Sequence, residues 1–124
     1  MSKRVLVVED QEDNRTILRD LLTSAGFEVL EAVNGVDGVE AAAREQPDLI
    51  LMDIQMPEMD GYEATRQIKS KPVMTAIPVI AVTSYALSGD EEKAKAAGCD
   101  DYVTKPFSPR ALLATVRAWL ENPA

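Results

Sequence analysis

The chain has no histidine and only one cysteine, Cys99. These absences argue against disulfides, zinc sites and histidine-based catalysis. No apolar run approaches the roughly 20 residues that a membrane-spanning helix needs. The first four residues lead straight into a strand pattern, without the apolar core and cleavage site of a signal peptide. We therefore expect a cytoplasmic protein that does not enter a membrane.

Positive charge is also scarce, because 13 Lys and Arg stand against 21 Asp and Glu, for a net charge of −8. Nucleic-acid binding requires clustered Lys and Arg, so we do not expect it here. Repeats, low-complexity tracts and linker-like composition are absent as well. A chain of 124 residues that is 46% hydrophobic can bury a core of its own. We expect one domain over residues 1–124, with no effector domain.

Three short runs are almost entirely apolar: residues 5–8, 49–52 and 78–82. Such runs are typical of strands that are buried on both faces inside a parallel sheet. Two further strand patterns, at residues 28–32 and 101–104, are more polar. The sequence therefore predicts three central strands and two edge strands.

Helical patterns lie after each of these strands. The first spans Asp13 to Ala25, with Gly26 as its stop, and the last begins at Ser108-Pro109. The second helix follows Asn34-Gly35, carries Val36, Val39 and Ala43, and ends before Pro47. The third opens at Asp60-Gly61 and carries Tyr62, Ala64, Thr65 and Ile68, and the fourth runs from Ser88-Gly89-Asp90 to Gly98. The apolar residues of the last helix are Leu112, Leu113, Val116, Trp119 and Leu120.

Five strands that alternate with five helices predict an α/β fold, with a doubly wound parallel sheet covered on both faces. The order 2-1-3-4-5, as in flavodoxin-like (βα)5 folds, places the apolar strands centrally, although polarity alone does not exclude other orders. In this order the winding reverses between strands one and three. Ligands bind at such a switch point, which here lies between Glu9-Asp10 and Asp53.

Three carboxylates, on Glu9, Asp10 and Asp53, should meet in this crevice, with no histidine or arginine among the residues placed there. An aspartate after an isolated strand most often only begins a turn, but here other strands also end in polar residues. At roughly 4 Å and an effective dielectric near 20, each like-charged pair costs on the order of 4 kcal/mol. Mg²⁺, which keeps several waters and takes few carboxylates, is the cation that fits best.

A hydroxyl and an ammonium group stand across the same crevice, on Thr83 and Lys105. Together with a cation they would surround the Asp53 carboxylate with groups that bind a doubly charged tetrahedral oxyanion. Aspartate is a competent covalent nucleophile, and stabilising the phosphoryl oxygens is most of the catalytic task. The pattern therefore predicts phosphoryl transfer onto Asp53.

At this point the motifs resemble those of a known family, the receiver domains of two-component response regulators. The resemblance covers the whole chain and includes each family hallmark in order. Glu9 stands where many members have Asp. The matching motifs are Glu9-Asp10, Asp53-Ile54-Gln55-Met56-Pro57, Met59-Asp60-Gly61, Thr83 and Tyr102-Val103-Thr104-Lys105-Pro106.

The resemblance implies that Asp53 is the phosphoacceptor. Its donor would be a phosphohistidine on a histidine kinase or a histidine phosphotransfer protein. Glu9 and Asp10 would be the acidic pair that supports Mg²⁺, with the Asp53 carboxylate and the backbone carbonyl of Gln55 as further ligands.

The resemblance also implies that Lys105 pairs with the phosphoryl group and that the Lys105-Pro106 bond is cis. Thr83 and Tyr102 would be a switch pair that reports phosphorylation to a protein-binding face and a downstream protein target. Such a chain is a signalling domain rather than an enzyme, although it would catalyse its own phosphorylation and slow autodephosphorylation.

Two other classes use similar parts. Phosphatases of the haloacid dehalogenase type have a strand-end Asp nucleophile and Mg²⁺, but their second acid is replaced here by Gln55. Flavodoxins have a loop rich in Ser, Thr and Gly after the first strand, whereas residues 9–13 of this chain are acidic or amide-bearing and would repel a flavin phosphate. Both classes are disfavoured.

Within the family, two forms remain open: a stand-alone regulator, or a receiver excised from a hybrid histidine kinase. The run from Val82 to Pro106 resembles both DivK-like cell-cycle receivers and hybrid-kinase receivers. Met1, just before the first strand, favours the stand-alone form. The cognate kinase, the target, the lifetime of the phosphorylated state and the oligomeric state do not follow from the sequence.

Overall fold

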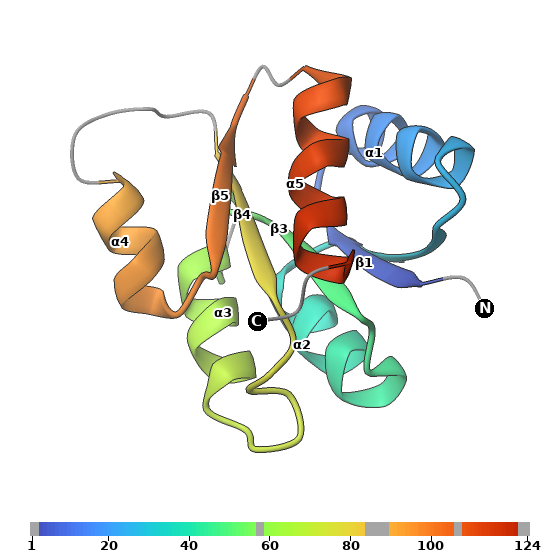
Figure 1. Cartoon of the computed structure of the whole chain (residues 1–124). Coiled ribbons are helices and arrows are strands. Elements are labelled where there is room, and N and C mark those ends of the chain that lie inside the picture. The colour runs from blue at the N-terminus through green and yellow to red at the C-terminus, as the bar shows by residue number, and fades with distance from the viewer. Residues whose placement is uncertain (1–2, 57–58, 84–89, 106–107, 122–124) are drawn as a thin grey trace.

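A computed structural model describes residues 3–56, 59–83, 90–105 and 108–121. Within these residues, five strands alternate with five helices (Figure 1). The strands are β1 (Arg4–Val8), β2 (Glu28–Ala32), β3 (Leu49–Asp53), β4 (Val79–Thr83) and β5 (Asp101–Thr104). The helices are α1 (Glu12–Ser24), α2 (Gly35–Glu45), α3 (Gly61–Lys69), α4 (Asp90–Ala97) and α5 (Pro109–Glu121).

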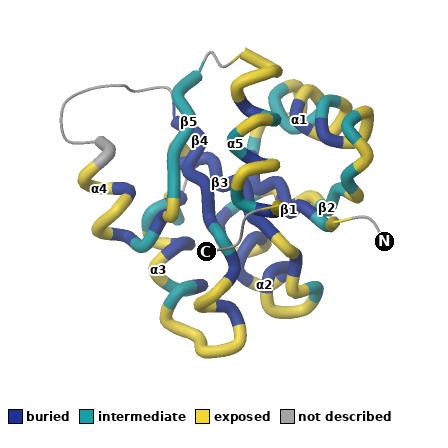
Figure 2. Tube along the Cα trace, in the orientation of Figure 1, coloured by how far each residue is buried: buried dark blue, intermediate teal, exposed yellow. Residues whose placement is uncertain are grey.

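The strands form one parallel sheet in the order β2-β1-β3-β4-β5, which confirms the predicted topology. The predicted central strands β1, β3 and β4 do lie inside the sheet, and the more polar β2 and β5 are its edges. Figure 2 shows the contrast, since β3 and β4 are buried along their length whereas β5 is only half-buried. Hydrophobic burial thus accounts for the central positions of β1, β3 and β4. Within the observed order, β1 and β3 lie side by side, where the winding reverses.

Helices cover both faces of the sheet (Figure 1). On one face α1 and α5 pack over alternate strand residues, including Val7, Leu51 and Val82. On the other face α2, α3 and α4 pack over the intervening residues, including Val8 and Met52. No helix of the described residues is both long enough and apolar enough to span a membrane.

Local sequence sets the helix ends much as predicted. Gly26 and Gly98 follow α1 and α4 with positive φ, at 95° and 103°. The side chains of Asn34, Asp60 and Ser108 each accept a hydrogen bond from the backbone N–H three residues on, which caps α2, α3 and α5. These caps fix where each helix begins relative to the strand before it.

Some packing differs from the prediction. Val36 in α2 is exposed, and the helix instead buries Val39 together with small residues, because Gly38 lies directly against the Val8 side chain. In α1, Ile17 is also exposed, while Leu18 and Leu22 reach the core. Element ends differ by a residue: α1 begins at Glu12 and ends at Ser24, and β4 runs to Thr83.

Part of the prediction falls on residues outside the described ranges. These are the turn at Pro57, the segment 84–89 with its expected helix start, and the Lys105-Pro106 bond.

Candidate functional site

The carboxyl ends of three strands surround one polar cavity. Glu9 and Asp10 directly follow β1, Asp53 is the last residue of β3, and Lys105 directly follows β5. The cavity has a volume of about 170 Å³. The residues that line it are Glu9, Asp10, Gln11, Asn14, Asp53, Gln55 and Lys105. It lies at the predicted switch point between β1 and β3.

Lys105 joins the two buried carboxylates. Its Nζ atom donates to Glu9 Oε1 at 3.1 Å and to Asp53 Oδ1 at 3.3 Å. Glu9 is 1% exposed and Asp53 is 3% exposed, so solvent screens these charges little. The Lys105 backbone N–H donates to the Thr83 carbonyl at 2.6 Å, which ties the end of β5 to the end of β4. The lysine is therefore held in place from both its backbone and its side chain.

The three carboxylates lie close enough to share one cation. One oxygen from each of Glu9, Asp10 and Asp53 can be chosen so that all lie within 4.8 Å of one another. Asp10 Oδ1 is buried and has no hydrogen-bond partner among the described residues. A buried carboxylate oxygen without a partner is costly, and a hard cation would satisfy it. The donor set therefore fits Mg²⁺, which binds carboxylate oxygens and retains waters.

The local charges alter two pKa values. Burial raises the pKa of Glu9 above its ordinary value; repulsion from Asp53 adds to this rise, while the Gln11 N–H and Lys105 oppose it. Burial alone would lower the pKa of Lys105, but attraction to Asp53 and Glu9 outweighs it, and the pKa of Lys105 is raised. The lysine therefore stays positively charged at neutral pH, with two carboxylates close to it.

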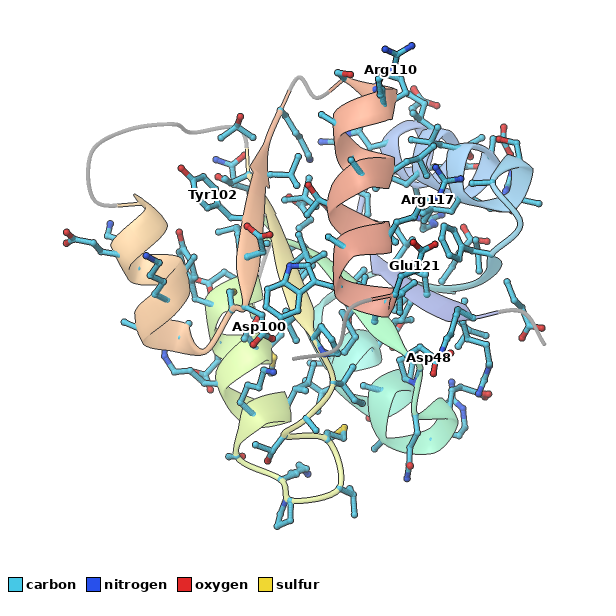
Figure 3. The ribbon with its side chains drawn as sticks, viewed as in Figure 1. Asp48, Asp100, Tyr102, Arg110, Arg117 and Glu121 are labelled. Carbon is cyan, nitrogen blue, oxygen red and sulfur yellow. The ribbon has the colours of Figure 1, made fainter. Side chains whose placement is uncertain are left out.

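Thr83 and Tyr102 lie on neighbouring strands and share one face of the sheet. Tyr102 is paired in register with Ala81, and Thr104 with Thr83. Because side chains alternate along a strand, all four side chains point to the face covered by α3 and α4. Figure 3 shows the Tyr102 ring on the side of β5 that faces α4, where it packs half-buried against the core. Thr83 is buried and is not among the residues that line the cavity.

The loop after β3 is held at both ends. The Ile54 N–H donates to the Val82 carbonyl, and the Ile54 carbonyl accepts from the Gly61 N–H, both at 3.1 Å. A Cβ atom at Gly61 would lie 2.3 Å from the Asp53 carbonyl oxygen, so only glycine permits this approach. The Gln55 N–H donates to Asp53 Oδ1 at 3.3 Å. The loop thus fixes both the Asp53 backbone and one of its carboxylate oxygens.

Sequence reasoning missed three residues near the site. Gln11 and Asn14 line the cavity, and the guanidinium of Arg15 reaches the Glu9 carbonyl oxygen at 3.0 Å. All three follow the acidic pair Glu9-Asp10 closely in sequence, before or within the first turn of α1. A helix beginning at Glu12 turns Asn14 toward the cavity, so the helical pattern itself held a signal for that residue.

Comparison with known proteins agrees with this geometry. A family model described as "Response regulator receiver domain" matches residues 5–117. The polar-differentiation response regulator DivK of Brucella anthropi is 42% identical over 120 residues, which cover 97% of this chain and 98% of that protein.

Solved structures give the same result. The receiver domain of sensor histidine kinase PA1611 from Pseudomonas aeruginosa, with a magnesium ion coordinated in its active site cleft, superposes with a TM-score of 0.92 at 37% identity. It is matched over 98% of this chain and 100% of that one. The chemotaxis protein CheY4 of Vibrio cholerae gives a TM-score of 0.90 at 28% identity, over 94% and 98% of the two chains. The chain belongs to the response regulator receiver domains, the phosphoacceptor signalling domains of two-component systems.

Proposed function

We propose that Asp53 accepts a phosphoryl group from a phosphohistidine on a histidine kinase or a histidine phosphotransfer protein. The observation that supports this most directly is the position of its carboxylate. Asp53 is buried at the end of β3, accepts from Lys105 at 3.3 Å, and lies within 4.8 Å of the carboxylates of Glu9 and Asp10. Three carboxylates and an ammonium group line one cavity, and this supports a nucleophilic role for Asp53 and a cation-binding role for Glu9 and Asp10.

Mg²⁺ is the proposed cofactor. Glu9, Asp10 and Asp53 would hold it through carboxylate oxygens, with the backbone carbonyl of Gln55 as a further ligand. The orphaned Asp10 Oδ1 atom supports this assignment because it would gain a partner. Bound there, the ion supplies positive charge that offsets the charge on the phosphoryl oxygens.

In the proposed reaction, a carboxylate oxygen of Asp53 forms a bond to phosphorus while the phosphorus–nitrogen bond to the donor imidazole breaks. The electron pair of that bond stays on the imidazole nitrogen, which takes up a proton. Lys105 Nζ already lies within hydrogen-bonding distance of Asp53 and would donate to a phosphoryl oxygen of the product. Slow attack by water on the acyl phosphate would regenerate Asp53.

The test uses a small acyl phosphate donor, so that no kinase needs to be known. Wild type, Asp53→Asn and Asp48→Asn are incubated with acetyl phosphate in Mg²⁺ or in EDTA and separated on Phos-tag gels. Asp48 is a matched control because it adjoins the opposite end of the same strand. We expect labelling of wild type and Asp48→Asn in Mg²⁺ only, and none of Asp53→Asn. Equal labelling of Asp53→Asn would overturn the assignment.

The proposed output is a change of the face formed by α4, β5 and α5. Phosphoryl oxygens on Asp53 would attract the Thr83 hydroxyl, since a charge-assisted hydrogen bond is about twice as strong as a neutral one. Thr83 and Tyr102 share a sheet face, so movement of one changes the space open to the other. A half-buried Tyr102 ring would then become buried, and a downstream protein target would distinguish the two forms.

Thr83→Ala tests this output separately from the chemistry. The variant should still be phosphorylated on Asp53 but should lose phosphorylation-dependent binding of the target. Ring signals of Tyr102 in NMR spectra, with and without beryllofluoride, measure the proposed movement in wild type. An unchanged ring environment would contradict a signalling route through Tyr102.

A further inference from the structure

Arg15 of α1 bonds the backbone of Glu9, the first residue of the acidic pair Glu9-Asp10. Its Nη1 atom donates to the Glu9 carbonyl oxygen at 3.0 Å, and its Nε atom donates to Glu31 Oε1 of β2 at 3.2 Å. The Arg15 side chain is only 16% exposed. One guanidinium therefore connects α1, the end of β1 and the edge strand β2, beside the cavity but without contacting a cavity carboxylate.

Glu9 needs such support because regular strand pairing has ended. The registers of β1 with β2 and with β3 both stop at Val8. Beyond it, the Glu9 N–H donates to the Ala32 carbonyl at 3.1 Å, and the Glu9 carbonyl accepts from Arg15. Both backbone polar groups of Glu9 are thus bonded, and these bonds fix the direction in which the chain presents Glu9 and Asp10.

We propose that Arg15 is a positioning residue for the cation site, which acts by holding the Glu9 backbone so that the Glu9 and Asp10 carboxylates face Asp53. This inference rests on the proposed Mg²⁺ site. The planar guanidinium suits the role, because it can bond the Glu9 carbonyl and the Glu31 carboxylate at once in a fixed geometry. Groups that orient metal ligands without touching the metal commonly affect affinity by tenfold or more.

The sign of the effect separates positioning from simple electrostatics. Removal of a positive charge close to a cation site should strengthen Mg²⁺ binding if Coulomb energy alone is at work. Loss of positioning should weaken it. A weaker Mg²⁺ affinity in an Arg15 variant therefore cannot be explained by the charge change.

Arg19 supplies a matched control on the same helix. It lies one turn after Arg15 and approaches the same Glu31 carboxylate, at 3.7 Å. Within the described part of the chain, Arg19 pairs with Glu31 and Asp20 and does not bond Glu9. Arg19→Ala thus removes the same charge without removing a bond to the acidic pair.

The test is calorimetric titration of Mg²⁺ into wild type, Arg15→Ala, Arg15→Lys and Arg19→Ala, with a thermal melt of each. We expect the dissociation constant of Arg15→Ala to rise about tenfold. Arg19→Ala should bind as tightly as wild type or slightly more tightly. Arg15→Lys, which keeps one donor and the charge, should lie closer to wild type than Arg15→Ala does.

An Arg15→Ala variant that binds Mg²⁺ as tightly as Arg19→Ala would overturn the inference. If Arg15→Ala does not melt cooperatively, Arg15→Gln decides in its place, because it loses the same charge with a milder truncation. If wild type itself does not bind Mg²⁺, the proposed cation site is wrong. If wild type and Arg15→Ala bind Mg²⁺ equally well, the cation site stands and only the role of Arg15 is wrong.

Discussion

At each end of the sheet a basic residue lies among three carboxylates, but the two groups differ in burial. At the amino end, Arg4 meets three carboxylates: it bonds Glu45 Oε1 at 2.8 Å, Glu28 Oε2 at 3.3 Å and, through its backbone N–H, Asp48 Oδ2 at 2.8 Å. Glu28 is 60% exposed, and Asp48, which directly precedes β3, is exposed as well and lies at the edge of the fold in Figure 3. Water screens these charges.

At the carboxyl end, Lys105 also meets a group of three carboxylates, but two of them are almost fully buried. One Asp10 oxygen there has no partner among the described residues, whereas each amino-end carboxylate is bonded. Burial removes the screening, so mutual repulsion at this end is not relieved by the protein alone. Burial, rather than the number of charges, therefore distinguishes the end that we propose to bind a cation and a phosphoryl group.

Removal of Lys105 from one end, or of Arg4 from the other, should give the largest difference in stability between the two ends. In metal-free buffer, Lys105→Met should lower the free energy of unfolding by about 3 kcal/mol, because it leaves buried carboxylates unpaired. Arg4→Met should lower it by about 1 kcal/mol, since its partners remain hydrated. Urea unfolding in EDTA measures both. Equal losses in the two variants would contradict the difference between the ends.

Removal of one carboxylate from each end should change stability in opposite directions. Asp10→Asn relieves repulsion by Glu9 and Asp53, so it should raise the metal-free free energy of unfolding by about 1 kcal/mol and weaken Mg²⁺ binding. Asp48→Asn weakens an acceptor of the Arg4 N–H and should lower stability slightly. An Asp10→Asn variant that is less stable without metal, and that binds Mg²⁺ as well as wild type, would refute the account of repulsion.

The pH dependence of stability should carry a smaller signal from Glu9. Its pKa is raised in the folded protein by burial, so the folded state binds the proton more readily than the unfolded chain. The resulting stability is fully present below the ordinary value of 4.5 and is lost as the pH rises through the raised pKa. Metal-free wild type should therefore gain stability relative to Glu9→Gln as the pH falls from neutral.

Glu45→Gln is the control for that titration, because Glu45 lies at the partly exposed amino end. Melting curves of the three proteins between neutral pH and about pH 5 supply the comparison. A constant difference between wild type and Glu9→Gln across this range would exclude the proposed contribution of Glu9.

Much of this arrangement could be predicted because simple rules determine it. Fully apolar runs predicted the three central strands, and parallel strands deliver their carboxyl ends to one edge. Glu9, Asp10, Asp53 and Lys105 could therefore be brought together from sequence alone, and the structure places all four around one cavity.

Two of the missed features, the bond from Arg15 to Glu9 and the exposure of Val36, depend on tertiary packing that no local pattern encodes. Arg15 could not be assigned to Glu9, because the rotation of α1 against β2 decides which of its arginines reaches the strand end. Val36 fits the helical period but is exposed, because Gly38 is the residue of α2 that faces the sheet, against Val8, and Val36 lies two residues earlier, on the opposite side of the helix. The hydrophobic period indicates which residues share one face of a helix, but not how closely that helix packs against the sheet.

The most direct test of the central claim is the unfolding free energy of wild type in EDTA and in saturating Mg²⁺. A cation that binds only the folded protein stabilises it, by about 2.7 kcal/mol at a concentration 100 times the dissociation constant. We predict a rise in stability with the logarithm of Mg²⁺ concentration, retained in Arg4→Met and greatly reduced in Asp10→Asn. Identical unfolding curves of wild type in EDTA and in Mg²⁺ would contradict the claim that the buried carboxylates form a cation site.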